Sequence, residues 1–204
     1  MTKDDVAVLP ASAELDREAD NKTIFGFWVY LMTDCVLFAS LFATYAVLHP
    51  NTFGGVSSQD IFSPPFVLAE TLILLTSSFT CGLGLLASRR KDTRQTLVFL
   101  GITFLLGLAF ITMELSEFHH LVSEGNSWRM SGFLSSFFTL VGTHGLHISI
   151  GLLWLLVTIF QIVRRGFTEG VARRLTLFTM FWHFLDVVWI FIFTIVYMMG
   201  VLVK

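Results

Sequence analysis

The chain consists of long apolar stretches separated by short polar segments. Five stretches are long enough to cross a bilayer, at residues 24–48, 65–87, 95–118, 133–163 and 175–203. A hydrocarbon core of about 30 Å is crossed by about 20 helical residues. Apolar and polar residues do not alternate within these stretches, which disfavours the strands of a membrane β-barrel. The pattern predicts an all-α membrane protein, a single-domain bundle of five transmembrane helices.

Composition and charge support this prediction and orient it. Charged residues make up 14% of the chain and hydrophobic residues 54%, whereas soluble domains carry about 25% charged residues. Of the 13 Lys and Arg residues, all but Arg129 and Lys204 lie before the first stretch or in the connections that follow the second and fourth stretches. Because cytoplasmic loops are enriched in basic residues, we expect a cytoplasmic N-terminus and a periplasmic C-terminus.

The polar segments outside the five stretches are short. Residues 1–23 are acidic and lack the features of a secretory signal, so we expect a polar cytoplasmic tail. Residues 49–64 contain Pro50, Gly54 and Gly55 and predict an ordered external turn. These segments leave no room for a soluble catalytic domain, a nucleotide-binding fold or a nucleic-acid platform. Any function is therefore expected within the bilayer.

Ionisable side chains inside the apolar stretches carry most of the remaining information. A charge at the bilayer centre costs several kcal/mol, roughly 2.5 to 3.5 for Asp, unless it faces other protein. Depth along each helix predicts that Asp34 and His147 lie near the midplane of the bilayer. His183 and Asp186 are expected on the cytoplasmic side of the midplane. The residues expected on its external side are Glu70, Glu114, Glu117 and His144. Several of these residues are three positions apart, which places each such pair on one helix face.

Two interpretations of these groups compete. Histidine and carboxylate are ligands for iron, zinc or copper and can mark proton pathways, but they also link helices by hydrogen bonds. A di-iron bundle needs Glu-x-x-His on two helices, and here this pattern occurs once, at Glu117 and His120 near a predicted helix end. We favour structural contacts between helices and expect no catalytic, cofactor-binding or metal-binding residue in this chain.

Small residues on the fourth apolar stretch predict close helix packing. Gly145 and Ser149 are four residues apart, and Gly142 precedes them by nearly one turn. Small residues at this spacing let a neighbouring backbone approach closely.

Two motifs resemble one protein family. GTHGLH at residues 142–147 and WHFLDVVW at residues 182–189, together with Ser116-Glu117 near the end of the third stretch, resemble subunit III of the haem-copper respiratory oxidases. The segment GFWVYLMTDCVLFASLFATYAVL at residues 26–48 is similar to the form found in cytochrome bo-type ubiquinol oxidases. The resemblance extends from Thr23 to the end of the chain.

This resemblance implies a non-catalytic subunit in a proton-pumping complex of the bacterial inner membrane. Haems and copper would belong to subunit I, and the expected partners are subunits I, II and IV and phospholipids rather than a second copy of this chain. The subunit would support assembly, lipid binding and stability while the complex oxidises ubiquinol and reduces oxygen. Alternatives are a menaquinol or cytochrome c oxidase, or a free-standing small transporter or metal-binding membrane enzyme that uses the ionisable groups above.

Overall fold

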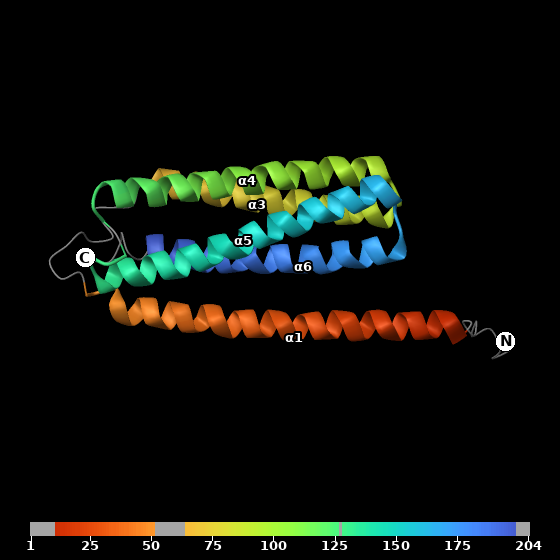
Figure 1. Cartoon of the computed structure of the whole chain (residues 1–204), viewed down its shortest axis with the longest axis horizontal. Coiled ribbons are helices and arrows are strands. Elements are labelled where there is room, and N and C mark those ends of the chain that lie inside the picture. The colour runs from red at the N-terminus through yellow and green to blue at the C-terminus, as the bar shows by residue number, and fades with distance from the viewer. Residues whose placement is uncertain (1–10, 52–63, 127, 199–204) are drawn as a thin grey trace, which may run out of the picture.

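The computed structural model describes residues 11–51, 64–126 and 128–198 and consists of long helices (Figure 1). They are α1 (Ala11–Leu48), α3 (Pro64–Arg89), α4 (Thr93–Ser123), α5 (Gly132–Arg165) and α6 (Glu169–Ile192), which continues as the π-helix η1 (Phe193–Met198). In this described part, five helices are long and apolar enough to cross a membrane. The predicted all-α bundle of five spans is confirmed. Most of the expected turn at 49–64 and the end of the last predicted span lie outside the described residues.

The helices pack as a bundle of four with α1 along one side. Helices α3 and α4 form the most extensive pair, and α5 and α6 pack against each other and against this pair. Helix α1 contacts α5 and α6, on the side of the bundle away from α4 (Figure 1). The ionisable residues predicted within the spans are distributed over all five of these helices and over their contacts.

Capping residues place several helix ends outside the predicted apolar stretches. The Asp92 side chain accepts a hydrogen bond from the Gln95 backbone N–H at 3.0 Å and starts α4, and Ser131 caps Leu134 of α5 at 3.1 Å. Such caps satisfy backbone donors that a helix start leaves free. Helix α5 ends at Arg165 and is followed by Gly166, whose φ of 69° is easily adopted only by glycine. Apolar content alone does not reveal these polar capping residues, so the predicted apolar stretches are shorter than the observed helices.

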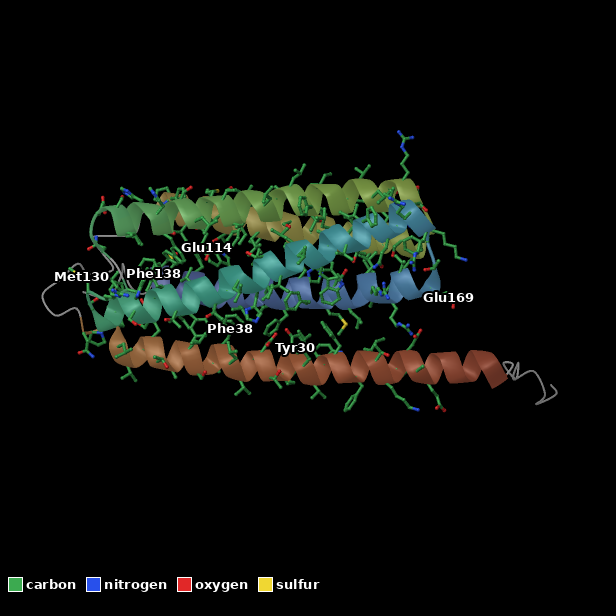
Figure 2. All side chains as sticks on the ribbon, viewed as in Figure 1. Tyr30, Phe38, Glu114, Met130, Phe138 and Glu169 are labelled. Atoms are coloured by element: carbon green, nitrogen blue, oxygen red, sulfur yellow. The ribbon has the colours of Figure 1, made fainter. Side chains whose placement is uncertain are left out.

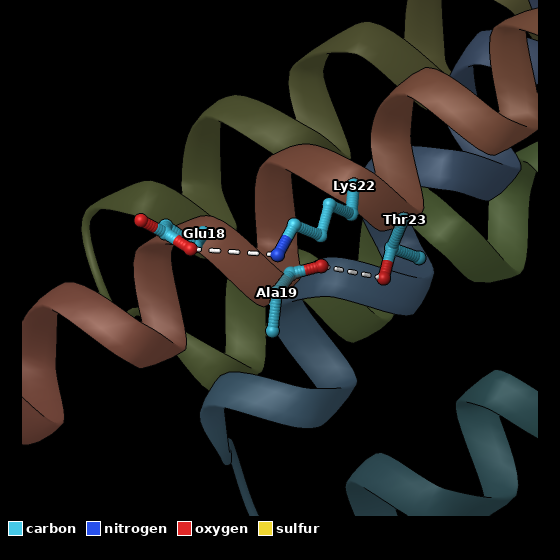
Figure 3. Close-up of polar contacts among 4 residues, drawn as sticks. All are labelled: Glu18, Ala19, Lys22 and Thr23. Carbon is cyan, nitrogen blue, oxygen red and sulfur yellow. Dashed lines mark hydrogen bonds and ion pairs between the residues drawn. The ribbon is translucent and has the colours of Figure 1, made fainter.

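The largest boundary difference is at the start of α1. The helix begins at Ala11 rather than near residue 24, so the second half of the predicted tail is helical. Ala, Glu, Leu, Arg and Lys favour helix in water as well as in lipid, and Lys22 pairs with Glu18 one turn earlier at 3.4 Å (Figure 3). Figure 1 shows this end of α1 extending beyond the turn between α5 and α6.

The centre of the bundle is aromatic. Trp182 and Trp189 of α6 are 1% and 0% exposed. Trp182 lies against two glycines: a Cβ atom on Gly107 would be 3.0 Å from its ring, and one on Gly151 would also be 3.0 Å away. Because these glycines have no side chain, α4 and α5 can pack closely against α6. This packing holds the polar groups of α3 and α6 at fixed positions.

Candidate functional site

The midplane pair predicted from depth comes together between α1 and α5. His147 Nε2 lies 3.9 Å from Asp34 Oδ2, and both side chains are largely buried. His147 Nδ1 is 2.8 Å from the backbone carbonyl of Thr143, and because a carbonyl only accepts, Nδ1 donates this bond. Nε2 is therefore the nitrogen that faces Asp34, and Tyr30 is within hydrogen-bonding reach of the same carboxyl. The arrangement ties α1 to α5.

Three carboxyl groups predicted on the external side form one acidic cluster. Glu70 of α3 and Glu114 and Glu117 of α4 lie close enough to interact electrostatically with one another. Tyr197 of η1 donates a hydrogen bond to Glu117 Oε2 at 3.3 Å. Among the described residues, neither carboxyl oxygen of Glu70 has a hydrogen-bond partner, although Glu70 is fully buried. The cluster joins α3, α4 and η1.

Glu114 also explains one of the predicted close-packing residues. Its carboxyl group packs directly on Gly145 of α5, where an added Cβ would lie 2.8 Å from Oε1. A Cβ on Gly142 would make ordinary contact with Phe118 at 3.7 Å. Ser149 is exposed, and its hydroxyl donates to the Gly145 carbonyl of its own helix at 2.8 Å. Of the three small residues, Gly145 makes the tightest contact.

His144 sits in an aromatic box rather than with the carboxyl groups. Its ring stacks on Trp189 with centroids 5.3 Å apart and meets Phe110 edge-on at 6.0 Å. Phe38, on the side of α1 that faces the other helices, lies 6.4 Å away (Figure 2). Neither ring nitrogen has a hydrogen-bond partner within the part of the chain that the structure describes. The ring fills space between α1, α4, α5 and α6.

The third predicted pair lies at the contact of α3 and α6 and opens to the outside. Ser78 Oγ is 2.7 Å from His183 Nδ1, and Ser78 also interacts with the Asp186 carboxyl. His183 is exposed and Asp186 is partly buried. We call the exposed His183, Leu75, Phe79 and Ile190, together with the partly buried Asp186 and the buried Ser78, the outer α3–α6 face.

Sequence reasoning missed the polar contacts on the inner side of the same two helices. Trp182 Nε1 donates to Ser77 Oγ at 3.3 Å, and Trp189 Nε1 donates to Thr71 Oγ1 at 3.1 Å. We call these four residues the inner seam. The two tryptophans are seven residues apart and so share a helix face. Because a buried indole N–H needs an acceptor, this spacing could have revealed the seam.

The geometry offers hydrogen bonds and packing. In the described ranges no group of three or more His, Cys, Asp or Glu side chains is arranged to hold a metal ion. The ionisable residues are spread over separate contacts, which link α1 to α5, α3 to α4 and η1, and α3 to α6. This dispersion suits a structural protein within the membrane.

These features define a multi-span helical membrane protein whose buried polar groups meet at helix contacts. Comparison with known proteins identifies the family. Residues 16–201 match the family described as cytochrome c oxidase subunit III, and the chain belongs to that family. It is a multi-pass protein of the bacterial inner membrane. The resemblance found in the sequence motifs is confirmed.

Individual relatives come from several kinds of oxidase. The chain is 58% identical to "Cytochrome bo(3) ubiquinol oxidase subunit 3" of Pseudomonas aeruginosa, across 91% of this chain and 89% of that protein. It is 43% identical to "Quinol oxidase subunit 3" of Bacillus subtilis, across 93% of both chains. It is also 43% identical to "Cytochrome c oxidase subunit 3" of Bacillus sp. strain PS3, across 94% of this chain and 93% of that protein.

Proposed function

We propose that this chain is the non-catalytic subunit III of a proton-pumping cytochrome bo-type ubiquinol oxidase. The observation that carries the proposal is the 58% identity, over 91% of the chain, to a subunit 3 named for a ubiquinol oxidase. Identity to the relatives named for a quinol oxidase and a cytochrome c oxidase is 43%. This difference favours ubiquinol as the electron donor of the whole complex over menaquinol or cytochrome c.

The chain's own role is to pack and stabilise. Each intramembrane ionisable residue predicted from the sequence lies at a contact between helices, and several are paired there, such as Asp34 with His147 and Ser78 with His183. Hydrogen bonds such as that between Ser78 and His183, and close contacts between ionisable groups such as Asp34 and His147, fix helix register in lipid. Haems and copper reside in subunit I, subunits II and IV complete the complex, and phospholipid fills the remaining outer grooves. The groove between α1 and α6, lined by Phe38, Phe42 and Phe191, is one apolar place for an acyl chain.

The distribution of basic residues supports the proposed orientation. The turns between α3 and α4 and between α5 and α6 carry arginines, and both turns lie at the same end of the bundle as the start of α1 (Figure 1). Positive charge on one side of a membrane protein marks its cytoplasmic side. The N-terminus is therefore assigned to the cytoplasm and the C-terminus to the periplasm.

A deletion of this chain tests the non-catalytic role. Oxidase purified without it should retain its haem and copper content and its initial rate, while activity should decay faster during turnover than in the complete complex. Re-expression of the chain should restore the slower decay. Loss of haem or copper on deletion would overturn the assignment.

The electron donor is tested on the same complete complex. Oxygen consumption should be fastest with a ubiquinol analogue, slower with a menaquinol analogue and absent with reduced cytochrome c. Fastest turnover with either of the other two donors would replace the ubiquinol assignment.

A further inference from the structure

The acidic cluster of Glu70, Glu114 and Glu117 leads from the interior of the bundle toward the end assigned to the periplasm. Glu70 and Glu114 are 0% and 2% exposed, whereas Glu117 is only partly buried. Glu117 is six residues from the end of α4, and is therefore about 9 Å from the external end of that helix. Glu117 lies within reach of external water, whereas Glu70 and Glu114 are enclosed by protein.

The enclosed pair, Glu70 and Glu114, is not satisfied by the rest of the described chain. Both carboxyl oxygens of Glu70 and Oε2 of Glu114 have no hydrogen-bond partner among residues 11–51, 64–126 and 128–198. Within the same ranges, none of the ion pairs includes either glutamate. Because these oxygens are buried within this chain, lipid and neighbouring proteins cannot supply a partner either. The pair requires a ligand small enough to reside inside the bundle.

A proton fits this site better than a metal ion. The three carboxyl groups lie close enough to repel one another when they are charged. In the described part of the chain, however, no group of three or more His, Cys, Asp or Glu side chains is arranged to hold a metal ion. Carboxylates without a nearby cation are costly inside a membrane. A proton needs only one oxygen, removes the charge, and turns the carboxyl group into a hydrogen-bond donor.

The helices around the cluster bring no basic side chain to it. Helix α5 contributes Gly145, on which the Glu114 carboxyl packs, while the adjacent His144 ring lies in its aromatic box. The π-helix η1 contributes Tyr197, which donates a hydrogen bond to Glu117 Oε2 at 3.3 Å. Elements of this kind often occur at functional sites. Among the described residues, the titratable groups of the site are therefore three glutamates and one tyrosine.

We propose that Glu70 and Glu114 form a proton-binding site, and that protons reach it from the periplasm through Glu117. A hydronium ion at the periplasmic surface protonates the Glu117 carboxylate and becomes water. Glu117 then passes the proton to a carboxylate oxygen of the buried pair and becomes a carboxylate again, and release follows the same steps in reverse. Tyr197 holds Glu117 in place for this exchange. The site goes beyond the packing role proposed above and does not depend on the electron donor of the complex.

Infrared spectroscopy of the complete complex tests whether the pair holds protons. The carbonyl stretch of a protonated carboxyl group is separate from the bands of carboxylates and amides. At neutral pH, Glu70→Gln and Glu114→Gln should each remove a band of this kind from the spectrum of the parent complex. Glu124→Gln is the matched control, because Glu124 is exposed at the end of α4, and it should remove none. Retention of all parent carboxyl bands in either Glu70→Gln or Glu114→Gln would overturn the proposal.

A conservative variant covers the case in which glutamine at position 70 expels this chain from the complex. Glu70→Asp keeps a carboxyl group in a slightly different position, so it should shift the protonated carboxyl band rather than remove it. The presence of this chain in the purified complex shows that the variant is intact. An unshifted band in an intact Glu70→Asp complex would refute protonation at this residue.

Transfer of the complex into heavy water tests the route. The carboxyl bands assigned to Glu70 and Glu114 should shift as deuterium replaces the proton, and the rate of this shift measures access. Glu117→Gln keeps an acceptor for Tyr197 but cannot carry a proton. It should slow the shift by about tenfold or more, since a positioned carboxyl group speeds proton transfer by roughly a hundredfold. Glu124→Gln should leave the rate unchanged. Equal rates in Glu117→Gln and the parent complex would overturn the route through Glu117.

Discussion

The inner seam and the outer α3–α6 face lie on two sides of the same pair of helices. They differ in how completely the hydrogen bonds of their polar groups are formed. On the inner side each indole N–H donates a hydrogen bond to a hydroxyl of α3. The Ser77 hydroxyl in turn donates a hydrogen bond to the Thr103 carbonyl of α4 at 3.2 Å. On the outer side one carboxyl oxygen of Asp186 remains without a partner in the described chain. Because this oxygen is buried within the chain itself, the outer side is the less completely hydrogen-bonded side of the helix pair.

Removal of a tryptophan from the inner seam should have the largest effect. Trp182→Ala leaves a cavity between Gly107 and Gly151 and should destabilise the chain by about 3 to 5 kcal/mol. The measurement is the temperature at which this chain aggregates from the detergent-solubilised complex. Trp128→Ala is the control, since Trp128 is 53% exposed, and it should change that temperature little. Equal effects of the two substitutions would contradict the role assigned to the seam.

Substitution of Gly107, which packs against the Trp182 ring, should have the second-largest effect on stability. In Gly107→Ala the new methyl would lie 2.8 Å from Leu152 and 3.0 Å from Trp182, and overpacking of this kind costs about 1 to 3 kcal/mol. Gly101→Ala is matched to it, because Gly101 lies on the same helix with nothing within 4 Å of an added Cβ. Thermal unfolding of both variants should show a lower midpoint for Gly107→Ala alone.

The contrast between the two sides also shows what a sequence can and cannot predict. Hydrophobic length predicted all five spans, and depth grouped Asp34 with His147, which the structure brings to 3.9 Å. Depth and spacing report a residue's height and its face on one helix. They do not report which helices are neighbours, so the separation of His144 from the carboxyl cluster was not foreseen.

The roles of uncharged hydroxyl residues were the hardest to predict from the sequence. Ser77 and Thr71 are common in transmembrane helices, and only their pairing with tryptophans of a distant helix gives them a role. The start of α1 was missed for a different reason, because a helix that continues into water leaves no hydrophobic signal. The pairing of hydroxyls with tryptophans depends on tertiary contacts, and the start of α1 depends on local helix propensity. Neither follows from the length of an apolar stretch.

A single hydrogen bond of the inner seam should contribute less than the packing around it. Thr71→Val removes the acceptor of Trp189 at nearly constant volume and should cost about 1 kcal/mol. Thr76→Val is the control: Thr76 is exposed on the same helix and donates only to the Leu72 carbonyl at 2.7 Å. A thermal shift for Thr76→Val as large as that for Thr71→Val would mean that the interhelical bond contributes nothing of its own.

The smallest effect is expected where the same kind of polar contact lies in water. Arg173 at the start of α6 pairs with Asp20 in the part of α1 that precedes the apolar stretch, and both side chains are about half exposed, at 41% and 50%. Exposed ion pairs contribute about 0 to 1 kcal/mol and are screened by salt. Asp20→Asn should therefore lower the thermal midpoint slightly at low ionic strength and not at all in 1 M salt. Because bilayer contacts are shielded from ions, the effects of Trp182→Ala and Thr71→Val should be independent of salt. A salt-insensitive loss for Asp20→Asn would mean that this end of α1 is held in an environment as dry as the inner seam.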